Sequence, residues 1–150
     1  MSDLTELYQD LIRDHSKKPR NLREIESATR KLEGYNPLCG DRFTVYLDLD
    51  GEIIKDISFK GTGCAISTAS ASMMTQMLKG KSRSDAGRLF KAFRELLTAD
   101  DNTANEADLG KLMVFSGVRK FPVRVKCATL AWHTLNEALH GENHTVSTEE

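Results

Sequence analysis

The sequence lacks an excess of charge of either sign, and it lacks long apolar runs. Its 21 Lys and Arg residues nearly balance 22 Asp and Glu residues, giving a formal net charge of -1. Such a balance provides no broad positive field for a nucleic acid or an anionic membrane surface. No stretch approaches the roughly 20 apolar residues of a membrane span, and residues 1–10 mix acids with scattered leucines. We therefore expect a cytoplasmic protein that binds neither nucleic acid nor membranes.

Cysteine is also scarce, with three residues in 150. An odd number of cysteines argues against a disulfide framework and favours metal, redox or nucleophilic chemistry in a reducing compartment. A chain of this length with 39% hydrophobic residues can bury a core without disulfides. We expect one domain over residues 1–141, followed by a flexible C-terminal tail over residues 142–150.

The apolar periodicity predicts helices around a short β-hairpin. Helical spacing and capping residues predict one helix from the N-terminus to about His15 and others over residues 65–79, 85–97, 109–115 and 122–140. A weak strand is expected over residues 30–35, and alternation predicts two strands on either side of the Asp50-Gly51 turn. This order predicts an α+β fold, in which a small antiparallel sheet of about three strands is covered by helices.

The register of the hairpin is predicted from its apolar residues. Pairing Leu49 with Ile53 also places Val45 opposite Ile57 and Phe43 opposite Phe59. Continued beyond the strands, this pairing brings Asp41 opposite Gly61, and Cys39 opposite Gly63. Three side chains are therefore expected to cluster at the open end of the hairpin, those of Cys39, Asp41 and Cys64.

This cluster has the composition of a soft metal site. Cys64 directly precedes the helix expected over residues 65–79, where a helix N-terminus stabilises a thiolate. If Cys127 also converges on the cluster, three thiolates and the Asp41 carboxylate make a tetrahedral set suited to zinc. The spacing of the cysteines does not by itself place Cys127 there. Four cations, Arg119, Lys120, Arg124 and Lys126, precede Cys127 and form a local positive patch that suits thiolates or an acidic partner.

Three motifs then resemble those of a known family. They are Pro37-Leu38-Cys39-Gly40-Asp41, Gly61-Thr62-Gly63-Cys64-Ala65-Ile66-Ser67 and Phe121-Pro122-Val123-Arg124-Val125-Lys126-Cys127. In this order they resemble SufU-type proteins, which belong with the IscU-like iron–sulfur assembly proteins and the NifU N-terminal family. Lys126 stands where the scaffold branch of that family has a histidine, which favours the SufU-type branch.

The resemblance implies a function and roles for single residues. It implies a zinc-dependent sulfurtransferase, a sulfur acceptor and carrier that takes persulfide sulfur from a SufS-type cysteine desulfurase for iron–sulfur cluster assembly. Zinc would be bound by Cys39, Asp41, Cys64 and Cys127, with Cys39 as the catalytic persulfide acceptor. Arg124 would dock the desulfurase, and downstream iron–sulfur assembly proteins would receive the sulfur.

Two other functions remain open at the level of sequence. The same four ligands could hold a transient 2Fe-2S cluster on a scaffold protein. A purely structural zinc site is the third reading, although tight pairs of Cys or His would then be expected. The histidines His15, His133, His140 and His144 are more simply explained as surface residues than as ligands.

Overall fold

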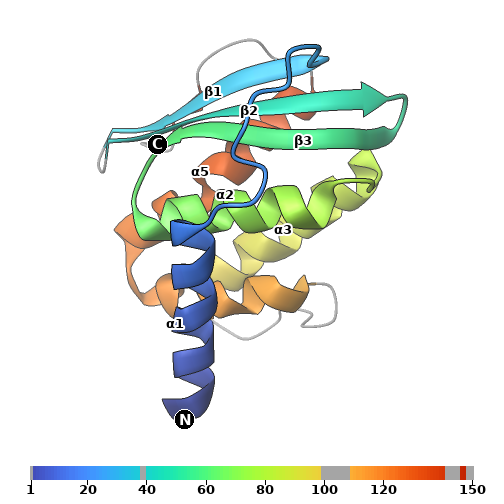
Figure 1. Cartoon of the computed structure of the whole chain (residues 1–150). Coiled ribbons are helices and arrows are strands. Elements are labelled where there is room, and N and C mark those ends of the chain that lie inside the picture. The colour runs from blue at the N-terminus through green and yellow to red at the C-terminus, as the bar shows by residue number, and fades with distance from the viewer. Residues whose placement is uncertain (1, 38–39, 99–108, 141–145, 148–150) are drawn as a thin grey trace.

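The computed structural model describes residues 2–37, 40–98, 109–140 and 146–147, and it shows a small sheet with helices on one face (Figure 1). The three long strands are β1 (Arg30–Asn36), β2 (Asp41–Asp50) and β3 (Ile53–Thr62). The helices are α1 (Ser2–Lys17), α2 (Ala65–Leu78), α3 (Arg83–Thr98), the 3-10 helix η1 (Gly110–Lys120) and α5 (Pro122–Leu139). The predicted α+β class and the antiparallel sheet are confirmed. None of the described helices is long and apolar enough to cross a membrane.

The sheet has the strand order β3-β2-β1-β4, in which β1, β2 and β3 pair antiparallel. The fourth strand, β4 (Val146–Ser147), has two residues and pairs in parallel with Gly34 and Tyr35 of β1. It lies within the segment 142–150, for which a flexible tail is predicted. The other residues of that segment lie outside the described part of the chain.

The predicted register of the hairpin is wrong by two residues. Val45 pairs with Phe59, and Phe43 pairs with Gly61. One residue of the error comes from the turn, because Asp50 pairs with Ile53 and Leu49 with Ile54. The second comes from a register shift beside Asp48 and Leu49, which leaves Lys55 as an extra residue on β3. Because side chains alternate with a period of two, the slip of two residues keeps Val45, Ile57 and Phe59 on the buried face. Next to the turn the predicted face is wrong, since Ile53 is 44% exposed and Ile54 is fully buried.

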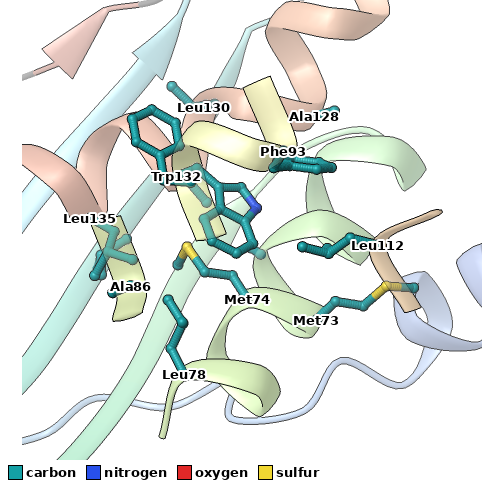
Figure 2. Packing of buried hydrophobic residues seen from close by; sticks show 14 of the residues in the cluster. Met73, Met74, Leu78, Ala86, Phe93, Leu112, Ala128, Leu130, Trp132 and Leu135 are labelled. Atoms are coloured by element: carbon teal, nitrogen blue, oxygen red, sulfur yellow. The ribbon is translucent and has the colours of Figure 1, made fainter. Parts of the chain in front are cut away.

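Helix α2 packs against α1, α5 and β3. Most of its buried residues are small or hydroxylated, which lets neighbouring elements approach closely. The predicted role of the methionines as core filling is confirmed, because Met73 and Met74 are fully buried. Figure 2 shows the Met74 side chain beside the Trp132 indole of α5 and the Met73 side chain near Leu112 of η1.

One prediction about the histidines is also wrong. His15, near the end of α1, is only 1% exposed, and its Nδ1 lies 2.7 Å from the hydroxyl of Ser72 on α2. Burial lowers the pKa of His15, because it disfavours the charged ring. The residue joins α1 to α2 rather than facing solvent.

Hydrogen bonds tie α2 to the hairpin at both ends of the helix. Beyond its C-terminus, the Gly80 amide donates to the Ile54 carbonyl at 2.7 Å, and the Ile54 amide donates to the Lys81 carbonyl at 2.8 Å. Before its N-terminus, the Cys64 amide donates to the Asp41 carboxylate at 2.9 Å. The position of Cys64 is therefore fixed relative to β2 and β3.

Candidate metal centre

Asp41 is the first residue of β2, and its side chain is 2% exposed. Oδ1 accepts the hydrogen bond from the Cys64 amide, and Oδ2 lies 3.8 Å from the Cys64 sulfur. A buried carboxylate is costly unless hydrogen bonds or a cation compensate for the lost hydration. Asp41 is thus held facing Cys64, the cysteine of the second motif.

Cys64 is the N-cap of α2, and it is exposed. Its sulfur accepts a hydrogen bond from the Ser67 amide at 3.4 Å, and the Ser67 hydroxyl lies 3.5 Å away. Gly63 allows this approach, because a Cβ at that position would lie 2.4 Å from Ser67 Oγ and 2.7 Å from the Phe43 ring. The glycine before the cysteine is therefore a steric requirement of the site.

Cys127 reaches the same place from α5, and it is buried with 3% exposure. Its sulfur accepts a hydrogen bond from Nδ2 of Asn36, the last residue of β1, at 3.7 Å. The helix can approach β1 closely because Gly34 has no side chain. A Cβ there would lie only 1.9 Å from Oγ1 of Thr134.

The three side chains form one group with the chemistry of a metal site. One carboxylate oxygen and the sulfurs of Cys64 and Cys127 all lie within 4.8 Å of one another. Two sulfurs bound to one zinc at about 2.3 Å would lie about 3.8 Å apart, so a small inward movement would suffice. Two soft sulfurs and one carboxylate fit zinc and exclude calcium and magnesium as preferred ions.

The surroundings of Cys64 favour its thiolate. Its pKa falls from 9.0 to about 6, chiefly through the hydrogen bond with the Cys127 side chain and further through the hydroxyl and amide of Ser67. Burial and the negative charge of Asp41 act in the opposite direction. This lowered pKa favours the deprotonated form of Cys64, which is the form that binds a metal.

Two other predicted site residues, Cys39 and Arg124, are not part of this group of three side chains in the described structure. Cys39 lies outside the described residues, although its neighbour Gly40 donates its amide to the Asn36 carbonyl at 2.8 Å. Arg124 lies one turn before Cys127 on α5, where its guanidinium stacks 4.8 Å from the centre of the exposed Phe121 ring. The structure thus brings Asp41, Cys64 and Cys127 together and places Arg124 on the adjoining surface.

Sequence reasoning missed two residues that support the sulfurs. Ser67 stands three residues after the N-cap Cys64, which is the usual spacing of a capping partner and could have been recognised. Asn36 was considered only as part of the Asn36-Pro37 turn. Its bond to Cys127 joins residues 91 positions apart, and no local pattern reports such a contact.

The fold and the site together define a class, namely small helix-covered sheet proteins of the SufU/IscU type with a cysteine and carboxylate site at one end of the sheet. Residues 7–139 match the family described as the NifU-like N terminal domain. The chain belongs to this family.

Individual relatives cover nearly the whole chain. A Bacillus subtilis (strain 168) protein named zinc-dependent sulfurtransferase SufU is 41% identical over 141 residues, covering 94% of this chain and 95% of the relative. A Streptococcus pyogenes serotype M1 protein named iron–sulfur cluster assembly scaffold protein IscU is 41% identical, covering 93% and 86%.

A solved structure agrees with the fold. FiSufU from Fervidobacterium islandicum AW-1, named as a candidate scaffold protein for the SUF system, superposes with a TM-score of 0.83 at 37% identity. The match covers 89% of this chain and 97% of that chain. The names of the relatives thus divide between sulfur transfer and scaffold roles.

Proposed function

We propose that this chain is a zinc-dependent sulfur acceptor and carrier, which takes persulfide sulfur from a SufS-type cysteine desulfurase for iron–sulfur cluster assembly in the cytoplasm. The observation that carries the proposal is the convergence of Asp41, Cys64 and Cys127 within 4.8 Å. The relative named as a zinc-dependent sulfurtransferase, which is 41% identical along almost its whole length, supports the same function.

In this proposal, Cys64 and Cys127 anchor the ion, while Asp41 and Cys39 complete the set of four ligands. Bound zinc would keep the cysteines deprotonated at neutral pH without redox chemistry of its own. The chain contributes the hydrogen bonds from Ser67 to Cys64 and from Asn36 to Cys127, which hold the two sulfurs in place.

Cys39 is the proposed sulfur acceptor, because it lies two residues before Asp41 and is within reach of the cluster. Its thiolate attacks the outer sulfur of the desulfurase persulfide. A new S–S bond forms at Cys39 as the bond within the partner's persulfide breaks, and the partner's cysteine leaves as a thiolate. The step needs no external oxidant, and Cys39 carries the sulfur away as its own persulfide to downstream assembly proteins.

Arg124 is the proposed docking residue for the desulfurase. It is exposed, and stacking on Phe121 orders its long side chain before a partner arrives. Arg124→Ala should raise the concentration needed for half-maximal stimulation of the desulfurase about tenfold, the equivalent of about 1.4 kcal/mol. Arg88→Ala, which removes an exposed cation from α3, is the matched control and should leave this concentration unchanged.

The experiment that tests the proposal combines metal analysis with desulfurase turnover. The purified protein should contain zinc and raise turnover of its desulfurase, and Cys39→Ala should abolish the stimulation. Mass spectrometry should find an added sulfur on Cys39 after reaction with the desulfurase and free cysteine. Zinc-loaded protein that neither stimulates turnover nor accepts sulfur would contradict the proposal and would favour a structural zinc site.

A second function has one observation in its favour, since the Streptococcus relative is named as a scaffold protein at the same level of identity. On this alternative, the same cysteines hold a 2Fe-2S cluster. Anaerobic reconstitution with iron and sulfide distinguishes the two functions. A zinc-free protein that forms a stable coloured cluster and leaves the desulfurase unaffected would identify the scaffold.

A further inference from the structure

Asn36 has a fully buried side chain at the end of β1, directly beside the candidate metal centre. Its Nδ2 donates a hydrogen bond to the Cys127 sulfur at 3.7 Å, within the range for bonds to sulfur. Helix α5 packs against β1 (Figure 1), and the bond between the Asn36 amide and the Cys127 sulfur crosses this contact between sheet and helix. A buried amide of this kind is a fixed donor, because it carries no titratable proton at any physiological pH.

The backbone of the same residue touches the other half of the site. The Asn36 carbonyl accepts a hydrogen bond from the Gly40 amide at 2.8 Å, and Gly40 directly follows Cys39 in the sequence. Asn36 is also the cross-strand partner of Asp41 in the register of β1 and β2. Asn36 is therefore connected with Cys127, with Asp41 and with Gly40.

We propose that Asn36 is a positioning residue of the metal centre, which orients the Cys127 sulfur and tunes its electron density. A donor to a thiolate lowers the energy of the sulfur lone pairs and restricts the directions in which the sulfur can bind an ion. The inference rests on the proposed function only in assuming that Cys64 and Cys127 bind a metal. It does not depend on sulfur transfer.

The test is Asn36→Leu, which keeps approximately the shape of the side chain and removes its donor. Asn136→Leu, at a half-buried position of the same helix as Cys127, is the control. Each protein is loaded with cobalt(II), which reports on thiolate ligands through a sulfur-to-metal charge-transfer band, and zinc affinity is measured by competition with a chromophoric chelator. Asn36→Leu should shift the band to longer wavelength and weaken zinc binding by about 10–100-fold, as for other partners of metal ligands.

A charge-transfer band and a zinc affinity equal to those of the parent protein in Asn36→Leu would overturn the inference. If Asn36→Leu does not fold, as judged by circular dichroism, Asn36→Asp replaces it. That variant keeps the shape and polarity of the side chain but turns the donor into an acceptor, and the same band shift is expected. If neither variant folds, the rate of Cys127 alkylation decides in metal-free Asn36→Ala, where an unchanged rate would refute the contact.

The outcome is separable from that of the proposed function. Cobalt spectra and zinc affinity are recorded without the desulfurase, and they can be repeated in a Cys39→Ala background. If the shift occurs while the desulfurase is not stimulated, Asn36 positions a metal ligand in a protein with another function. If the desulfurase is stimulated but the charge-transfer band does not shift, the proposed sulfur transfer is supported and the proposed role of Asn36 is wrong.

Discussion

The absence of a side chain at Gly34 should be required for the contact between β1 and α5. An added Cβ would lie 1.9 Å from Thr134 Oγ1, and 3.2 Å from both Thr134 Cβ and a methyl group of Leu130. Rotating the Thr134 hydroxyl away would break its 2.9 Å hydrogen bond to the Leu130 carbonyl. We therefore expect Gly34→Ala to destabilise the fold by about 1–3 kcal/mol, the usual cost of overpacking a core.

Urea unfolding of a double-mutant cycle measures this clash. Thr134→Ala removes the atom at 1.9 Å, so adding Gly34→Ala to it should cost at least about 1 kcal/mol less than adding it to the parent protein. The same clash pushes the strand of Asn36 away from the helix of Cys127, so zinc affinity should fall in Gly34→Ala and partly recover in the double variant. Equal stability of Gly34→Ala and the parent, or additive effects of the two substitutions, would refute the reasoning.

Three further predictions concern buried polar groups. The buried Trp132 indole N–H donates to Ser70 Oγ at 3.1 Å, and Ser70→Ala removes this acceptor. The free energy of unfolding in urea should therefore fall by about 1–3 kcal/mol. A change near zero would contradict this prediction. Ser67→Ala removes a hydroxyl that lowers the pKa of Cys64, so in metal-free protein the pH at which alkylation of Cys64 reaches half its maximal rate should move above about 6. If this pH did not change, the hydroxyl would have no effect on the pKa. Burial lowers the pKa of His15 from 6.5 in the folded protein, so the stability that the neutral ring contributes should be complete above that pH and should fall as the pH drops toward the folded pKa. The melting temperature of His15→Gln should therefore depend less on pH than that of the parent protein. An equal pH dependence in the two proteins would exclude His15 as the cause of the loss of stability.

The hairpin shows what an apolar pattern can predict and what it cannot. Away from the turn, alternation correctly predicts which faces of β2 and β3 are buried, because a slip of one residue would expose the whole set. At the start of β3 it fails, since Ile53 is exposed and Ile54 is buried. A slip of two residues preserves both faces, so Val45 could be assigned to Ile57 although it pairs with Phe59. The length of the turn, in which Asp50 pairs with Ile53, and the extra residue Lys55 together decide between these registers, and nothing in the alternation marks either.

The metal-site residues also differ in how far the sequence predicts their positions. Asp41 and Cys64 could be predicted as neighbours from the hairpin, and the error in register did not separate them. Cys127 arrives from α5, and its place depends on how that helix packs under β1. Gly34 allows α5 to approach β1, and Asn36 donates a hydrogen bond to Cys127 across this contact. Both roles depend on contacts between residues that are distant in the sequence.

The bonds that tie α2 to the hairpin at both ends have a consequence for changes in chain length. From Ile54 to Thr62, β3 extends about 26 Å, and the helical path from Cys64 to Gly80 rises about 24 Å. The two lengths match, so that Gly80 meets Ile54 while Cys64 meets Asp41. One inserted residue in α2 would add about 1.5 Å and turn every later side chain by about 100°. Insertions and deletions between residues 54 and 80 should therefore be excluded in functional variants of this protein, however conservative the inserted residue.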